Sequence, residues 1–188
     1  MSEPGDGESK PAPDLLSPAE RVARMIRVDQ AGEHGAVRIY QGQRAVLGKR
    51  PAADAALAKM EQAEREHLAT FNALMRERRV RPTLLAPLWH VAGFALGAGT
   101  ALLGEQAAMA CTVAVEEVIE EHYAGQAARL EGKGEGKLQG EIKKAREGEI
   151  EHRDTALAAG ARQAPGYTAL TGAVKTASRL AIWLSERL

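Results

Sequence analysis

Two Glu-x-x-His pairs constrain the fold of this 188-residue chain more than any other feature. Glu64 precedes His67, Glu149 precedes His152, and no other Glu in the chain has a His three positions later. Residues three apart on an α-helix lie about 60° apart, on the same face. If both segments are helical, each pair presents a carboxylate and an imidazole in the same direction.

Composition and turn signals predict helix along most of the chain. Ala, Leu, Glu, Arg and Lys dominate, and aromatic residues make up only 4%, which favours helix over strand. In "SPAE", Ser17 is a helix N-cap, Pro18 takes the first helical position and Glu20 completes a capping box. We expect four long helices over about 18–47, 51–79, 105–130 and 138–159. Pro165 is expected to open a fifth, with an apolar stripe at Leu170, Val174, Ala177, Ala181, Leu184 and Leu188 that packs on the core or on a partner.

An uncharged run separates the second long helix from the third. Residues 82–104 contain no Asp, Glu, Lys or Arg. A long crossover joins the two helix pairs of a ferritin-like bundle. The sequence therefore predicts an all-α protein, a ferritin-like four-helix bundle with an apolar crossover helix and an additional C-terminal helix. We expect this domain to span 18–188, after a disordered tail over 1–17 that is rich in Pro, Gly, Ser and acids.

Each of the four long helices carries one carboxylate within a stripe of apolar residues. The acids are Glu33 among Ile26, Val37 and Tyr40; Glu64 among Leu57, Met60, Phe71 and Leu74; Glu116 among Met109, Val113 and Tyr123; and Glu149 among Ile142, Ala145 and Ala156. A carboxylate in a protein core is costly unless it is paired or bound to a cation. These four positions are therefore candidates for cation binding.

The four acids also repeat along the chain. Glu33 and Glu64 are 31 residues apart, and Glu116 and Glu149 are 33 apart. Two such halves related by a pseudo-twofold axis would bring together the ligand set of a carboxylate-bridged dinuclear centre. Oxygen and imidazole ligands without thiolate favour iron or manganese. The predicted metal ligands are Glu33, Glu64, His67, Glu116, Glu149 and His152.

Neighbouring polar residues are open to more than one interpretation. Asp29, one turn before Glu33, either orients a ligand histidine or forms a plain salt bridge. His34 either supports the ligands or lies at the surface, and His122 either supports them or has no part in the site. Seven glutamates are expected at the surface: Glu61, Glu66, Glu117, Glu120, Glu121, Glu147 and Glu151.

Three stretches resemble the demethoxyubiquinone hydroxylase family of ubiquinone biosynthesis. They are "RVDQAGEHGAVRIYQGQ" (27–43), "PLWHVAGFALGAGTALLGEQAAMACTVAVEEVIEEHY" (87–123) and the C-terminal "AIWLSERL". The resemblance covers about residues 18–188 and assigns the ligands of a di-iron centre to the same six residues that the spacing selects. Arg153 departs from it, since some relatives have a second His there, as does Trp183, where some have Tyr.

The resemblance implies an oxygen-dependent monooxygenase with two Fe ions per chain, in which Mn could replace iron in vitro. Its substrate would be the ring of a demethoxy polyprenyl benzoquinone or quinol, and its reductant an external one of unknown identity. Two alternatives remain: a ferritin-like protein for iron storage or peroxide scavenging, and a metal-free interaction protein. A substrate with an isoprenoid tail also implies a peripheral membrane protein, on the cytoplasmic face if bacterial or on the matrix side of the inner mitochondrial membrane if eukaryotic.

The run at 82–104 is the predicted membrane contact. About 20 apolar residues can span a bilayer, but Pro82, Pro87 and His90 lie within the run, and spanning would pull the second long helix away from the third. We therefore expect a helix in the membrane interface with Trp89 at headgroup level. The alternative is a crossover packed on the bundle through Gly93 and Gly97.

Charge and cysteine usage exclude several other classes. The formal net charge is +0, and basic residues alternate with acidic ones, so no phosphate-binding stripe for nucleic acid is expected. Cys111 is the single cysteine, which excludes a disulfide scaffold and argues against a thiolate metal site. The N-terminus has no apolar core of a signal peptide and lacks Arg.

Accessory proteins of ubiquinone biosynthesis and a second copy of the chain are possible partners.

Overall fold

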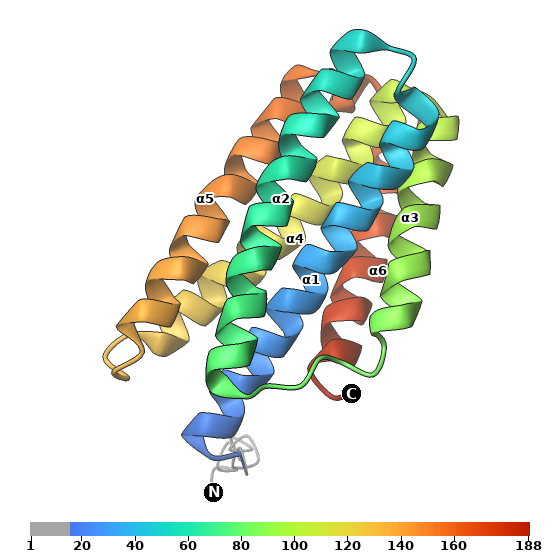
Figure 1. Ribbon diagram of the computed structural model, residues 1–188. Helices are drawn as coiled ribbons and strands as arrows, with labels where there is room; N and C mark the ends of the chain where they lie inside the picture. The colour runs from blue at the N-terminus through green and yellow to red at the C-terminus, as the bar shows by residue number, and fades with distance from the viewer. Residues whose placement is uncertain (1–15) are drawn as a thin grey trace, which may run out of the picture.

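The computed structural model describes residues 16–188, and this part of the chain is all-α (Figure 1). The expected disordered tail falls almost wholly on residues 1–15, which lie outside the described range. The described helices are α1 Pro18–Leu47, α2 Pro51–Arg78, α3 Ala86–Leu102, α4 Glu105–Leu130, α5 Gly136–Ala158 and α6 Tyr167–Ser185, with a 3₁₀ turn at Ala161–Gln163.

Most helix ends lie close to where the capping and turn residues of the sequence predicted them. Ser17 and Glu20 form the predicted capping box at the start of α1, and α4 has the expected bounds. The predicted start of α6 was wrong, because this helix begins at Tyr167 rather than at Pro165. Gly166 has a left-handed φ of 67°, a conformation that Gly adopts at little cost, and the turn that it makes delays the helix.

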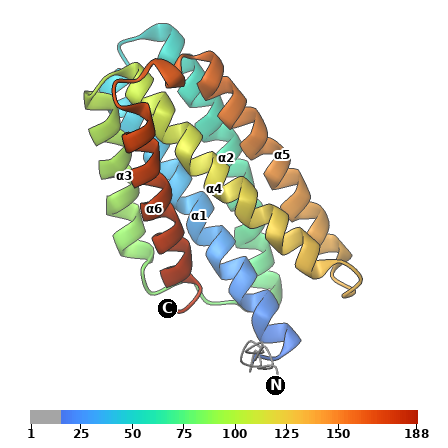
Figure 2. The same cartoon turned by 180° about the vertical axis from the view of Figure 1, so that it is seen from behind.

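The helices form three layers, which the two ribbon views show from opposite sides (Figures 1 and 2). Helices α1 and α4 form the middle layer, between α2 and α5 on one side and α3 and α6 on the other. Helix α3 runs back along the bundle, so α2 and α4 run in the same direction. This long crossover between two helix pairs is the connection of a ferritin-like bundle, as predicted.

The crossover helix packs on α1 through three glycines. A Cβ added to Gly97 would lie 2.0 Å from the Ile39 carbonyl oxygen, and one added to Gly93 would lie 2.8 Å from that of Gly35. On α1, a Cβ at Gly42 would lie 2.2 Å from the Phe94 carbonyl oxygen. The two backbones therefore approach more closely than side chains allow. This contact matches the packed alternative for residues 82–104.

The opposite face of α3 is nevertheless exposed. Leu88 and Val91 on this helix and Leu84 just before it are 52%, 65% and 80% exposed. Trp89 does not belong to this surface, because its Nε1 donates a hydrogen bond to Ser185 Oγ of α6 at 2.9 Å. The tryptophan that the sequence analysis expected at headgroup level is therefore turned toward α6.

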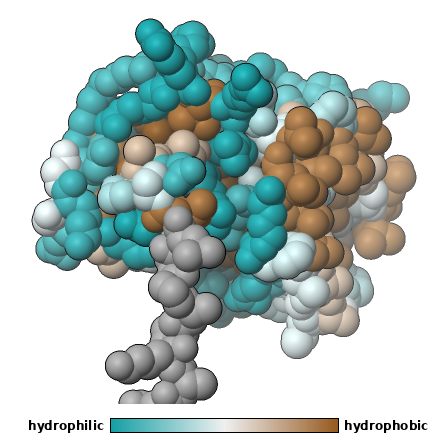
Figure 3. Space-filling model, turned by 90° about the horizontal axis from the view of Figure 1, so that it is seen from below, coloured by the Kyte–Doolittle hydropathy of each residue, from teal (hydrophilic) through white to brown (hydrophobic). Residues whose placement is uncertain are grey.

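The predicted stripe on α6 is only partly buried. Val174 is buried, whereas Leu188 is exposed, as are Leu180 and Trp183. Helix α6 lies at the edge of the bundle and packs chiefly against α4. Seen from below, apolar side chains gather on the side of the molecule where α3 and α6 lie (Figure 3). Among residues 16–188, no helix combines the length and the apolar character needed to cross a membrane.

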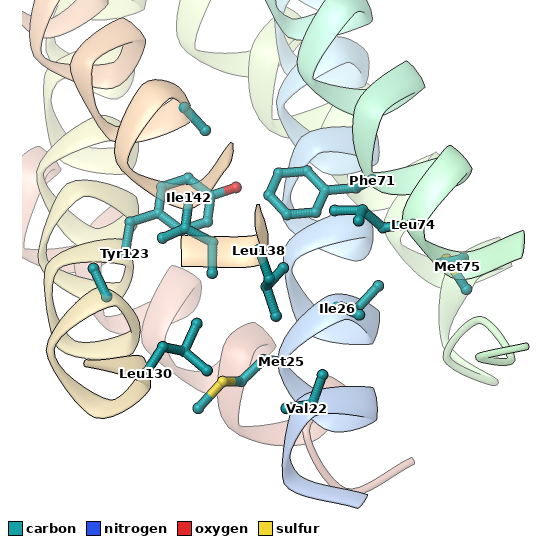
Figure 4. Packing of buried hydrophobic residues seen from close by; sticks show 12 residues of the cluster. Val22, Met25, Ile26, Phe71, Leu74, Met75, Tyr123, Leu130, Leu138 and Ile142 are labelled. Carbon is teal, nitrogen blue, oxygen red and sulfur yellow. The ribbon is translucent and has the colours of Figure 1, made fainter. Parts of the chain in front are cut away.

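Two apolar clusters fill the space between the middle layer and the layer of α2 and α5. Figure 4 shows one of them, near the ends of α2 and α4, where Ile26, Phe71, Tyr123 and Ile142 meet. The second cluster contains Tyr40, Leu57, Met109 and Ala156, among others. All four predicted acids lie between these clusters along their helices. The core therefore closes the acidic region from both ends.

Candidate metal centre

All six predicted ligands meet between the middle layer and α2 and α5. The structure brings them into two overlapping groups, within each of which one possible ligand atom per residue lies within 4.8 Å of the others. One group is Glu33, Glu64, His67 and Glu149, and the other is Glu64, Glu116, Glu149 and His152. Glu64 and Glu149 belong to both groups. This is the arrangement expected of two metal positions bridged by two carboxylates.

Most of the donor atoms are buried without a hydrogen bond, although His152 Nδ1 and Glu64 Oε1 lie 2.8 Å apart. The four glutamates are at most 1% exposed, and both carboxyl oxygens of Glu64 and of Glu149 have no hydrogen-bond partner. The same is true of one oxygen each of Glu33 and Glu116 and of Nδ1 of both histidines. Buried polar atoms are normally satisfied, and unpaired ones are costly. Bound cations would satisfy all of these atoms together, so the donor set fits a dinuclear centre.

Both imidazoles face the carboxylates through Nδ1. His67 Nδ1 lies 3.6 Å from Glu33 Oε2 and 3.6 Å from Glu149 Oε1. His152 Nδ1 lies 2.8 Å from Glu64 Oε1 and 3.7 Å from Glu149 Oε2. The two histidines thus lie at opposite ends of the cluster of carboxylates. Each is placed to bind one metal ion.

Burial and charge shift the pKa values of these groups strongly in the metal-free site. Burial, together with the charges of neighbouring carboxylates, raises the pKa of Glu33 and of Glu116 well above the usual range. Burial also opposes ionisation of Glu64, but contacts with His152 and His67 outweigh it and lower its pKa to about 2. Burial opposes protonation of His152, but contacts with Glu149 and Glu64 outweigh it and raise its pKa to about 9. Because ligands must lose their protons to bind a metal, metal binding at this site would release protons.

Two buried tyrosines hold the single glutamates of the middle layer. Tyr40 of α1 donates a hydrogen bond to Glu116 Oε1 of α4 at 2.5 Å. Tyr123 of α4 donates in the same way to Glu33 Oε1 of α1. From the sequence, Tyr40 was placed only in an apolar stripe, and a supporting role of Tyr123 beside the ligands was left open. The signal was present, since each lies two helical turns after the glutamate on its own helix, but the cross-helix pairing is a tertiary feature.

Tyr40→Phe is expected to lower metal affinity about 10- to 100-fold, the usual effect of losing a group that orients a ligand. The substitution removes one hydroxyl and leaves the shape of the buried ring. Isothermal titration of metal-free protein with Mn²⁺ would measure the change. Tyr167→Phe, at the start of α6 and away from the ligands, is the matched control. Equal affinities of the two variants would contradict this role for Tyr40.

Glu61 was wrongly expected at the surface. It is only 5% exposed and pairs with Arg44 at 2.8 Å and with Arg65 at 2.6 Å. It lies one helical turn before Glu64 on α2, and the two arginines offset its charge. Glu66, Glu121, Glu147 and Glu151 are exposed as expected, whereas Glu117 and Glu120 are half-buried and paired.

The other uncertain residues lie beside the ligands rather than among them. Asp29 Oδ1 lies 3.4 Å from His122 Nε2 and accepts a hydrogen bond from Gln126 Nε2 at 2.7 Å. Asp29 therefore pairs with His122 rather than with a predicted ligand histidine. His34 stacks on His90 of α3, with their ring nitrogens 3.3 Å apart. This pair joins α1 to α3.

An apolar pocket lies on the other side of the middle layer. Its volume is about 170 Å³, and residues of α1, α3, α4 and α6 line it. Its wall on α1 consists mainly of small residues, namely Ala31, Gly32, Gly35 and Ala36, which flank Glu33 in the sequence. The hydrogen-bonded Trp89 and Ser185 also line it. The middle layer thus presents carboxylates on one face and an apolar cavity on the other.

Comparison with known proteins decides the family. The family described as ubiquinone biosynthesis protein COQ7 matches residues 20–185. The chain belongs to the COQ7 family. A 3-demethoxyubiquinol 3-hydroxylase of Rhodospirillum rubrum is 61% identical to it over 172 residues, which cover 92% of this chain and 81% of that protein. The family to which the resemblance pointed is therefore confirmed.

Eukaryotic COQ7 relatives are also similar along most of their length. An NADPH-dependent 3-demethoxyubiquinone 3-hydroxylase of Homo sapiens is 54% identical over 170 residues, covering 89% of this chain and 78% of that protein. The protein of the same name from Bos taurus is 53% identical over 172 residues, covering 90% and 79%. Both are named as mitochondrial. COQ7 relatives are thus hydroxylases of a ubiquinone precursor, and this chain belongs to a family of enzymes.

Proposed function

We propose that this chain hydroxylates the ring of a demethoxy polyprenyl benzoquinol in ubiquinone biosynthesis, with oxygen as co-substrate and two iron ions as cofactor. The observation that carries the proposal is the cluster of six candidate ligand side chains, five of them buried and His67 partly buried, whose donor atoms include many without a hydrogen bond. Glu33, Glu64 and His67 would hold one iron together with Glu149. Glu116 and His152 would hold the other, with Glu64 and Glu149 shared between the two. Reduced iron at this site would supply the electrons that activation of oxygen requires.

The protein's own groups fix the ligands and exclude water. Tyr40 and Tyr123 hold Glu116 and Glu33 by hydrogen bonds across the middle layer. The apolar clusters above and below keep bulk water from the carboxylates. Exclusion of water strengthens electrostatic interactions within a site and limits side reactions. Two electrons from an external donor would be needed in each turnover to reduce the oxidised irons again. We propose NADPH or a related nicotinamide nucleotide as this donor from the names of the mammalian relatives.

The apolar pocket is the proposed site for the quinol and the first part of its tail. Ala31, Gly32 and Gly35 leave room for a ring beside the segment of α1 that carries Glu33. The tail would leave toward the exposed apolar face of α3 and α6 (Figure 3). An exposed apolar surface of this kind suits contact with a membrane. We therefore propose peripheral attachment to a bilayer through these two helices.

Anaerobic reconstitution with Fe²⁺ followed by exposure to oxygen tests the proposal. The protein, mixed with detergent-dispersed demethoxy quinol and a reductant, is expected to bind close to two irons per chain and to yield a ring-hydroxylated product. Mass spectrometry with ¹⁸O₂ should show one labelled oxygen atom in the product. Iron uptake with a ferric mineral and no ring product would support the iron-storage alternative. A protein that binds no iron would contradict both.

A further inference from the structure

A small cavity opens between α2 and α5, on the side of the metal centre away from the apolar pocket. Its volume is about 80 Å³, which is enough to hold water. Unlike the apolar pocket, it has charged and polar side chains in its wall. These are Glu66, His67, Thr70, Glu141 and Lys144.

His67 forms the inner wall of this cavity. Its side chain is 14% exposed, whereas those of Glu33 and Glu149, 3.6 Å from its Nδ1, are at most 1% exposed. Glu149 offers two carboxyl oxygens without hydrogen-bond partners just behind the ring. Rotation of one imidazole would therefore connect the cavity to the carboxylates.

Two exposed ion pairs join α2 and α5, one on either side of the cavity. Lys59 pairs with Glu151 at 2.7 Å toward one end, and Glu77 pairs with Lys137 at 2.7 Å toward the other. Within residues 16–188, neither Glu141 nor Lys144 of the cavity wall forms an ion pair. Among the described residues, the mouth of the cavity therefore has no ion pair of Glu141 or Lys144 across it. The contacts of His67 with Glu149 and of His152 with Glu64 lie deeper, among the candidate ligands.

The alternative way in is unsuited to a metal ion. The pocket on the other side of the middle layer is lined mainly by Ala, Gly, Val, Leu and Ile. A divalent cation would have to lose its hydration in an apolar environment to pass there, at a large cost in free energy. Carboxylates and a hydroxyl, as in the wall of the polar cavity, can replace water ligands one at a time.

We propose that the polar cavity between α2 and α5 is the entry port for hydrated Fe²⁺, with Glu66 and Glu141 attracting the ion and His67 acting as the inner gate. The inference rests on the proposed metal site and deepens it, since it assigns separate entrances to the metal and to the apolar substrate. Iron enters from solvent past α2 and α5. The quinol enters from the side of α3 and α6.

The rate of iron uptake tests the port. Metal-free protein is mixed anaerobically with Fe²⁺, and unbound Fe²⁺ is trapped with a coloured chelator at increasing times. Thr70→Leu, which fills the cavity, is expected to slow uptake at least tenfold without changing the final iron content. Ala92→Leu, which narrows the apolar pocket instead, is the matched control and should load at the wild-type rate.

A pair of charge changes provides a second test that does not depend on filling the cavity. Glu66→Lys with Glu141→Lys is expected to slow uptake roughly tenfold at low ionic strength and much less at high salt, as for electrostatic steering. If Thr70→Leu folds poorly or holds less iron, the double charge variant provides the test instead. Its substitutions should not disturb the core, because Glu66 is exposed and Glu141 half-exposed. Wild-type uptake rates in both variants would overturn the port, as would equal slowing by Ala92→Leu. A wild-type protein that takes up no iron would instead overturn the proposed metal site.

Discussion

Glu116→Gln is expected to abolish binding of the second metal ion and to lower hydroxylation at least a hundredfold. Loss of a group that only orients a metal ligand already lowers metal affinity or activity by up to a hundredfold, and Glu116 is itself a candidate ligand. The same change should stabilise the metal-free protein by about 1–3 kcal/mol at pH 7. The reason is that burial and the nearby charges of Glu149 and Glu64 raise the pKa of Glu116. The amide keeps an oxygen that accepts from Tyr40 but carries no charge.

The stabilisation by Glu116→Gln should depend on pH. A carboxyl whose pKa is raised in the folded state opposes folding once the pH exceeds its unfolded pKa, which is 4.5 for Glu. Both states are protonated below that pH, so the penalty disappears there. The difference in melting temperature between wild type and Glu116→Gln, both metal-free, is therefore expected to grow from pH 5 to pH 7.

Glu61→Gln is the matched control for this experiment. Glu61 is also buried, but Arg44 and Arg65 pair with it, so its charge is compensated. We expect its replacement to lower stability and to leave iron content unchanged. If Glu116→Gln stabilises the metal-free protein and Glu61→Gln destabilises it, Glu116 serves metal binding and Glu61 serves the structure. Destabilisation of the metal-free protein by Glu116→Gln would contradict this account.

Gly97→Ala is expected to destabilise the protein by about 3 kcal/mol, at the upper end of the usual cost of overpacking. The new methyl group would lie 2.0 Å from the Ile39 carbonyl oxygen of α1, and backbone cannot move aside as a flexible side chain can. The melting temperature should fall by roughly 6–12 °C for a chain of this size. Thermal unfolding followed by circular dichroism would measure it.

Gly99→Ala, two residues further along α3, is the control. A Cβ at Gly99 would meet no atom within 4 Å, and alanine in a helix interior is favoured over glycine by about 1 kcal/mol. This variant should therefore be as stable as wild type or slightly more so. If both variants lost the same stability, the cost would lie in the helix itself rather than in its approach to α1.

The sequence predicted the fold class and the residues that meet as candidate ligands because both depend on local periodicity. A helix repeats every 3.6 residues, so an acid such as Glu33 on a stripe with Ile26 and Tyr40 must share the buried face of these residues. The Glu-x-x-His spacing likewise fixes a carboxylate and an imidazole on one face. Four such faces in a single bundle have few ways to pack other than around one centre.

What the sequence did not reveal depends on how faces of different helices meet. Tyr40 reaches Glu116 on another helix, Glu61 is buried because two arginines cover it, and Trp89 turns toward Ser185 instead of outward. The spacing of residues within one helix determines the direction in which each side chain points from the helix axis. It does not determine which neighbouring helix lies in that direction. The sequence by itself thus determined the helices, the crossover and the six candidate ligands. Only the tertiary structure decided that the middle layer divides a polar cavity from an apolar pocket, because both lie between helices far apart in the chain.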